Sequence, residues 1–311
     1  MRKKNLSLCI ISLFIIQCNK PVEIDNTVYS LDGKKLEAAE LSPATKIKLE
    51  NNLKTAEKKY NNDPEKLDNI IWLGRRIAYL SRYNEAIDIF TKGIKKFPDS
   101  PELYRHRGHR YISVRKFDEA ISDFEKAAEL SKGMSVKIEP DGQPNKLSIP
   151  LSSLQFNIWY HLGLAHYLKR DFEKALAAYF RCMEYSTNND LLIATADWLY
   201  MTFKRLGKDE EAEELLEKIT EGMEIIENDA YYQRLLMYKG LKSTNDLIDL
   251  NNTDPDKLIE IVTQGYGVGN WYFIKGDIDK AKEIFNKVIK TGSWSAFGYI
   301  AAEADLYYMN K

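Results

Sequence analysis

A glycine followed twelve residues later by an alanine recurs along this chain, and this spacing constrains its fold more than any other feature. The pairs are Gly74/Ala86, Gly108/Ala120, Gly163/Ala175 and Gly269/Ala281. Four residues after each alanine stands an aromatic residue: Phe90, Phe124, Tyr179 or Phe285. Self-similarity at a fixed spacing is typical of architectures that stack one small supersecondary unit along the chain.

These positions predict a pair of antiparallel helices as the unit. The small residues let the two helices approach closely, and the aromatic residue fills the space between one pair and the next. Units are expected at 67–100, 101–134 and 156–189, with weaker copies further along. Only 16 Gly and 9 Pro occur among the 311 residues, which also favours helices.

This pattern resembles the tetratricopeptide repeat (TPR), a unit of 34 residues in two helices. The resemblance extends over roughly residues 43–309. It implies an all-α fold, a solenoid in which antiparallel helix pairs stack into a right-handed superhelix.

The resemblance also sets the expected domain organisation. The segments are a capping helix in 42–66, two units in 67–134, an insertion in 135–155, four units in 156–295 and a closing helix in 296–311. Ser42 and Pro43 are good residues for a helix start. The unit at 227–261 keeps only the outline of a helix pair, so we expect it to be degenerate.

The insertion 135–155 contains three prolines and a turn sequence, Pro140-Asp141-Gly142. The flanking segments 136–138 and 146–149 are predicted to pair as a short hairpin. Insertions in a solenoid fall on loops, often beside the binding face. Two interpretations stay open: a segment that takes part in binding, and a passive loop that covers the seam between two units.

The first residues read as an export signal. Arg2, Lys3 and Lys4 precede an apolar run that is too short to span a bilayer. The end of the run resembles the lipobox of bacterial lipoproteins, although Gln17 departs from the usual small residue. We therefore expect a signal in 1–17, lipidation of Cys18 and a tether in 18–41. This implies a lipid-anchored protein of the bacterial cell envelope; the alternatives are a plain secretory signal, which gives a soluble secreted or periplasmic protein, and an uncleaved anchor.

The TPR resemblance implies which side chains line the concave groove. They are Arg75, Tyr79, Arg105, His109, Tyr160, Tyr167, Asp197 and Arg205. Arg75, Arg105 and His109 would form a basic patch beside tyrosines, which suits an acidic or carboxylate-ended peptide because arginine binds carboxylates with two parallel hydrogen bonds. The alternative is that the arginines pair with acidic neighbours such as Glu102 and only solubilise the surface.

Other chemistry finds little support in the sequence. The four histidines, His106, His109, His161 and His166, gather in the second and third units, but no cysteine or carboxylate stands at ligand spacing beside them. The glycine-rich run 265–270 does not follow a strand, as a phosphate-binding loop would. We therefore expect no metal, no cofactor and no catalytic residues.

The sequence thus predicts a non-catalytic scaffold that binds a protein or peptide. The 45 Lys and Arg nearly balance the 46 Asp and Glu, so a nucleic-acid partner is not expected. Two alternatives stay open. One is an enzyme or small-ligand binder that uses the His/Arg cluster and the insertion 135–155; the other is a structural subunit of an envelope assembly that uses the convex face.

Overall fold

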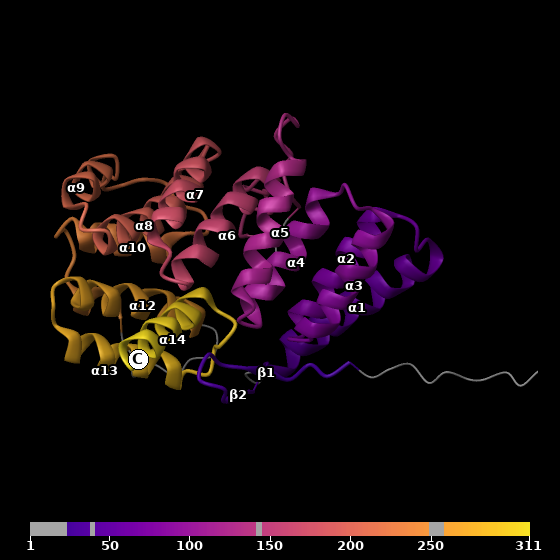
Figure 1. Ribbon diagram of the computed structural model, residues 1–311, viewed down its shortest axis with the longest axis horizontal. Helices are drawn as coiled ribbons and strands as arrows, with labels where there is room; N and C mark the ends of the chain where they lie inside the picture. Colours follow the sequence, from indigo (N-terminus) through magenta and orange to yellow (C-terminus); the bar gives the residue numbers. More distant parts are fainter. Residues whose placement is uncertain (1–23, 38–40, 141–144, 249–257) are drawn as a thin grey trace, which may run out of the picture.

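The structure of the protein, a computed structural model, describes residues 24–37, 41–140, 145–248 and 258–311. It has the predicted all-α fold, in which helix pairs stack on one another (Figure 1). The predicted export signal 1–17 and Cys18 lie outside the described residues. Within the described residues, no helix has both the length and the apolar character that crossing a membrane requires.

The first helix pairs follow the predicted units closely. Helix α1 (Pro43–Asn62) begins after Ser42, whose hydroxyl oxygen accepts the backbone N–H of Thr45 at 3.3 Å. The pairs that follow are α2 (Leu67–Tyr79) with α3 (Tyr83–Lys96), α4 (Pro101–Ser113) with α5 (Phe117–Leu130), and α6 (Leu154–Leu168) with α7 (Phe172–Glu184).

The second half is less regular. Its helices are α8 (Asn189–Arg205), α9 (Asp209–Glu217), α10 (Asp229–Tyr238), α11 (Thr244–Leu247), α12 (Leu258–Ile274), α13 (Ile278–Lys290) and α14 (Phe297–Met309). In the described residues 227–248, α10 is followed by the four-residue α11.

The recurring glycine and aromatic positions make the same contact in each pair. A Cβ atom on Gly74 would lie 2.5 Å from the ring of Phe90, and one on Gly163 would lie 2.6 Å from the ring of Tyr179. The other side of the Phe90 ring faces the next pair, where it stacks on His106 at 5.7 Å. The aromatic side chain therefore fills the space between neighbouring pairs, as the sequence predicts.

The C-terminal helices turn back across the inside of the stack. Helix α12 contacts α8 and α14 contacts α6, while α13 packs on α12 and α14; Figure 1 shows the three helices leaving the row set by α1 to α5. The ring of Phe297, on α14, lies 5.3 Å from His109 and 5.5 Å from His161. Glu303, also on α14, pairs with Arg115 at 2.6 Å. The chain therefore fills much of its own concave face.

Residues 24–37, which we expected to belong to a tether, form a small hairpin instead. Strand β1 (Val28–Tyr29) pairs with β2 (Lys35–Leu36), and Val28 is 3% exposed. The side-chain amide of Asn84 donates to the carbonyl oxygens of Asp25 and Thr27, at the start of α3. On the other side, the Leu31 N–H donates to Glu303 at 2.7 Å. The tether prediction is wrong here because this segment bridges α3 and α14.

The insertion also differs from the predicted hairpin. The backbone N–H of Glu139 donates to the Ser152 carbonyl at 3.0 Å, and the Leu154 N–H donates to the Lys137 carbonyl at 2.7 Å. Residues 136–138 therefore pair next to the start of α6, not with 146–149. This register turns Lys137 and Glu139 towards the solenoid, whereas Ile138 stays 54% exposed. The turn residues 141–144 lie outside the described residues.

Candidate functional site

A basic hollow lies on the inner face of the first two helix pairs. Its volume is about 430 Å³, part of which is open to solvent. The lining residues are Arg75 and Tyr79 of α2, Phe90 of α3, and Arg105, His106, His109 and Arg110 of α4. The hollow thus brings together the predicted basic patch, Arg75, Arg105 and His109, because α2 and α4 are the first helices of successive pairs.

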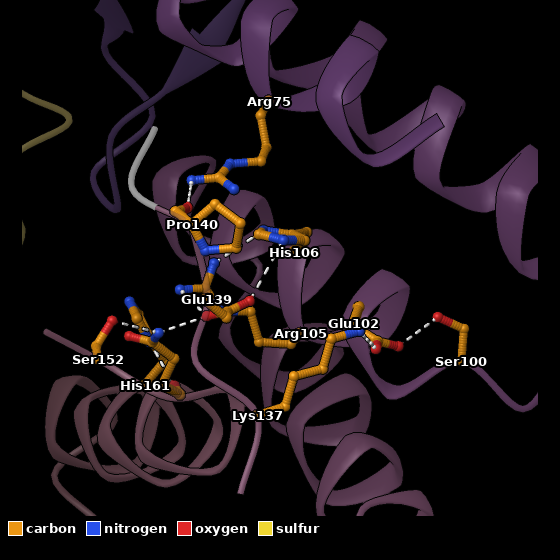
Figure 2. A network of polar contacts seen from close by, with 11 residues as sticks. Arg75, Ser100, Glu102, Arg105, His106, Lys137, Glu139, Pro140, Ser152 and His161 are labelled. Carbon is orange, nitrogen blue, oxygen red and sulfur yellow. Dashed lines mark hydrogen bonds and ion pairs between the residues drawn. The ribbon is translucent and has the colours of Figure 1, made fainter. Parts of the chain in front are cut away.

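The insertion places a carboxylate and a carbonyl against this patch (Figure 2). The guanidinium of Arg105 lies 3.1 Å from the carboxylate of Glu139, and these side chains are 11% and 8% exposed. Arg75 donates a hydrogen bond to the carbonyl oxygen of Pro140 at 2.9 Å. The side-chain amide of Asn157, on α6, donates to the Glu139 carboxylate. The chain's own insertion therefore supplies an anion to Arg105 and a carbonyl oxygen to Arg75.

Glu102 holds the insertion at a second point rather than pairing with the arginines. Its carboxylate binds the ammonium of Lys137 at 2.7 Å and accepts the Ser100 hydroxyl at 2.8 Å. The alternative, pairing of the arginines with acidic neighbours, is therefore met in part: Arg105 pairs with an acidic residue, but this residue is Glu139 and not Glu102, and Arg75 binds a carbonyl. The insertion thus binds α2 and α4 through three groups: the ammonium of Lys137, the carboxylate of Glu139 and the carbonyl oxygen of Pro140 (Figure 2).

The histidines of the hollow are neutral. Burial, followed by the charges of the nearby arginines, lowers the pKa of His106 and of His109 well below its usual value. Arginine can only donate, so the bond from Arg105 makes Nδ1 of His106 an acceptor and leaves its proton on Nε2. That nitrogen lies 3.5 Å from the Glu139 carboxylate. The positive charge of the hollow therefore comes from arginine.

Arg110 is a third guanidinium that sequence reasoning did not select. Its guanidinium lies 5.4 Å from the centre of the Tyr83 ring, a cation–π contact, and it lines the hollow beside Arg105. The sequence signal that could have identified it is its position directly after His109, a predicted groove residue of the second unit. In the described part of the chain, Arg105 is the one of these three arginines in ion-pair contact with a carboxylate, that of Glu139.

The remaining groove residues are buried. Tyr160 accepts a hydrogen bond from the Trp198 indole at 2.8 Å, and Tyr167 accepts one from the Tyr266 hydroxyl at 2.9 Å. Asp197 is 0% exposed and binds Arg234. Their predicted exposure in an open groove is wrong, because α10, α12 and α14 cover the inner faces of α6 and α8.

Arg205 is also inside, paired with Asp305 of α14 at 2.6 Å. Burial raises the pKa of Asp197 to about 7, although Arg234 opposes this shift. Arg234 fits because Gly267 has no side chain: a Cβ there would lie 2.4 Å from its guanidinium. The glycine-rich run 265–270 therefore lies within helix α12 and accommodates an arginine, not a phosphate group.

The histidine cluster divides into two places. His109 and His161 face each other with ring centres 4.5 Å apart, while His166 lies beside Asp171 at 3.5 Å. Throughout the ranges that the structure describes, no three His, Cys, Asp or Glu side chains come together in a way that could hold a metal ion.

Stacked helix pairs around a basic inner hollow define a helical-repeat protein. The tetratricopeptide repeat family model matches residues 101–133, 156–189 and 266–291. These ranges correspond to α4–α5, α6–α7 and most of α12–α13. Three segments of the chain therefore match this family, on a TPR-like fold of stacked helix pairs.

One curated relative, the BBSome complex member BBS4 of Bos taurus, is 24% identical over 138 residues. That match covers 44% of this chain and 22% of the relative, so the chain spans about a fifth of that protein's length.

Three solved structures are similar at low identity. YrrB, described as a TPR protein with an unusual peptide-binding site, is 17% identical over 76% of this chain and 91% of its own, with a TM-score of 0.41. MamA is 15% identical over 66% of this chain and 100% of its own, with a TM-score of 0.44. A putative kinesin light chain of Podosopora anserina is 15% identical over 73% of this chain and 95% of its own, with a TM-score of 0.42.

Proposed function

We propose that this protein is a non-catalytic scaffold that binds an acidic segment of a protein or peptide at the basic hollow of α2 and α4. The observation that carries the proposal is the contact of Arg105 with the Glu139 carboxylate and of Arg75 with the Pro140 carbonyl. A side-chain carboxylate and the next backbone carbonyl are the groups that a bound peptide presents. Charge-assisted hydrogen bonds of this kind are strong and directional.

The size of the hollow limits what can bind. The space of about 430 Å³ includes open solvent, so the enclosed part accommodates at most one or two side chains or a chain end, but not a helix. Because α14 and the hairpin β1–β2 fill the inner face beyond it, the partner enters as a short extended segment. Tyr79 at the rim offers a rigid, amphipathic contact surface for that segment.

A small free carboxylate is the second candidate ligand. The partial enclosure of the hollow and its three guanidinium groups favour it over a ligand that spreads along an open groove. The two candidates share their recognition chemistry, so they are separated by whether binding needs the peptide around the carboxylate.

We also propose, on the basic, apolar and cysteine order of residues 2–18, that the scaffold is attached to the bacterial cell envelope through lipid on Cys18. A binding module held at a membrane surface meets partners at the same surface, where the local concentration is high. The attachment and the binding site are independent parts of the proposal.

An array of acidic peptides tests the binding site. Wild-type protein is compared with Arg75→Ala and with the control Arg181→Ala, which removes a half-exposed arginine of α7 that pairs with Glu184. Arg75 is chosen because its one hydrogen bond to a described residue goes to a carbonyl, so its loss strands no carboxylate there. We expect Arg75→Ala to lose about tenfold or more in affinity for acidic peptides and Arg181→Ala to lose none.

Equal binding by Arg75→Ala and wild type would contradict the proposal. Direct binding of succinate separates the two candidate ligands. A dissociation constant for succinate in the micromolar range, measured without any peptide, would favour the small-ligand candidate.

A further inference from the structure

We propose that residues 137–140 of the insertion are an internal copy of the ligand, and that the partner binds by displacing Glu139 and Pro140 from Arg105 and Arg75. This inference rests on the proposed function and adds two things to it. It names the chemistry of the partner's segment, and it makes the insertion a competitor for the site.

The way the insertion docks is the first argument. Its backbone hydrogen bonds are made with the chain before α6, through Glu139 to Ser152 and Leu154 to Lys137. Towards α2 and α4, its ion pairs and hydrogen bonds come from the Glu139 carboxylate, the Lys137 ammonium and the Pro140 carbonyl. An extended segment from another protein can supply each of these groups.

The second argument is that the insertion leaves the hollow incompletely satisfied. The Nε of Arg105 is buried and has no hydrogen-bond partner. Arg110 contributes a further guanidinium that no described carboxylate contacts. Because an unpaired buried donor costs free energy, a carboxylate that also reaches these groups would bind better than Glu139 does.

The third argument is the weak apolar hold on the insertion. Val136, Ile138, Leu147 and Ile149 are between 52% and 58% exposed, so these side chains contribute little burial. By contrast, the ion pair of Arg234 and Asp197 is fully buried between helices. Segments held by few buried contacts open at low free-energy cost, which makes the Glu139 contact the exchangeable one.

The docked groups define what the partner must carry. Lys137 binds Glu102, Glu139 binds Arg105 two residues later, and the carbonyl of Pro140 accepts from Arg75. Side chains two residues apart point the same way in an extended segment. The partner segment is therefore extended, with a glutamate two residues after a lysine.

The test uses a fluorescent peptide with the sequence of residues 134–140, Met-Ser-Val-Lys-Ile-Glu-Pro, blocked at both ends. Its dissociation constant is measured by anisotropy with wild type, Glu139→Gln and the control Glu129→Gln, which removes an exposed carboxylate of α5. We expect Glu139→Gln to bind at least tenfold tighter than wild type, because the internal competitor has lost its charge. Glu129→Gln should match wild type, and a peptide with Gln for Glu should bind Glu139→Gln at least tenfold more weakly.

A second variant covers the case in which Glu139→Gln does not fold. Lys137→Ala removes the tie to Glu102 and keeps Glu139, so it should bind the peptide about two- to fivefold tighter. The blocked peptide carries one lysine and one glutamate and so has no net charge. Loss of the Lys137 charge therefore changes its long-range attraction little, and tighter binding reports release of the site. Thermal unfolding of each variant shows which of them is folded.

Equal affinity of wild type and the folded variants, absence of binding, or indifference to the peptide's glutamate would overturn the inference. The proposed function fails separately. If Arg75→Ala loses acidic peptides on the array while Glu139→Gln gains nothing, the inference falls and the binding site stands. If Arg75→Ala loses nothing, the binding site itself is wrong.

Discussion

The carboxylate of Glu139 lies 3.1 Å from the guanidinium of Arg105, and both side chains are largely buried. The pair joins an irregular insertion to the first helix of the second TPR unit. It has two consequences: the basic patch is not a bare surface, and its two arginines differ in what they contribute to stability.

Arg105→Ala should lower the free energy of unfolding by about 2–4 kcal/mol, because it leaves the Glu139 carboxylate largely buried without its cation. Arg75→Ala should cost less than about 1 kcal/mol, because its bond to Pro140 is exposed. Urea unfolding of both variants measures the difference. Equal losses would show that the Arg105–Glu139 contact is not populated in solution.

Ala120→Phe should lower the free energy of unfolding by about 1–3 kcal/mol, because Ala120 is fully buried and a ring there overpacks the second helix pair. Lys116→Ala, on the exposed turn before α5, is the control and should change it by no more than about 0.5 kcal/mol. The measurement is the urea midpoint and slope. A tolerated phenylalanine at residue 120 would mean that the repeat register is incorrect.

His161 should make the protein less stable as the pH falls. Burial lowers its pKa from 6.5 to about 3, with Arg105 and Arg110 acting in the same direction. Between about pH 6.5 and 3, this histidine is therefore protonated in the unfolded chain but not in the folded protein. The free energy of unfolding decreases as the pH falls through that window. At pH 5 this histidine alone should cost about 2 kcal/mol relative to pH 7.5.

The matched variant is His161→Phe, which keeps an aromatic ring against Phe124. Unfolding free energies at pH 7.5 and 5 should fall less in His161→Phe than in wild type. A difference between the two pH values that is the same in both proteins would contradict the shifted pKa.

Cys18→Ala should move the protein from the membrane fraction to the soluble fraction, if lipid on this residue anchors it. Acyl chains supply about 0.8 kcal/mol of membrane affinity for each buried CH₂ group, so loss of the acylated residue is decisive. Fractionation of cells grown with labelled palmitate measures acylation and membrane attachment in one experiment. Label that persists in Cys18→Ala would refute the anchor.

The sequence was sufficient for those parts of the fold that local spacing determines. Gly74 and Phe90 contact each other because their spacing places them on facing helices of one pair, and this contact repeats wherever the spacing does. The nearness of Arg75 and Arg105 followed in the same way from their places in successive units.

Contacts between distant segments could not be predicted, because the repeat spacing in the sequence determines only contacts within a unit and between neighbouring units. The hairpin around Val28 reaches Glu303, and α14 carries Phe297 to His109. These contacts bury an inner face that the repeat pattern alone leaves open. The clearest missed signal was Arg234, a charged residue among the apolar residues of α10. A charge in that position predicts a buried partner of opposite charge, which in the structure is Asp197.

Photo-crosslinking from the rim of the hollow tests the central claim most directly. Benzoylphenylalanine is introduced in place of Tyr79, which lines the hollow, and in a second protein in place of Phe180, which is 51% exposed on α7. Each protein is irradiated in a cell extract that includes the membrane fraction, with and without an excess of an acidic peptide. The account predicts a partner crosslinked at residue 79, competed by the acidic peptide, and no such product at residue 180. A partner that crosslinks at residue 180 and not at 79, or a product at 79 that the acidic peptide leaves unchanged, would contradict it.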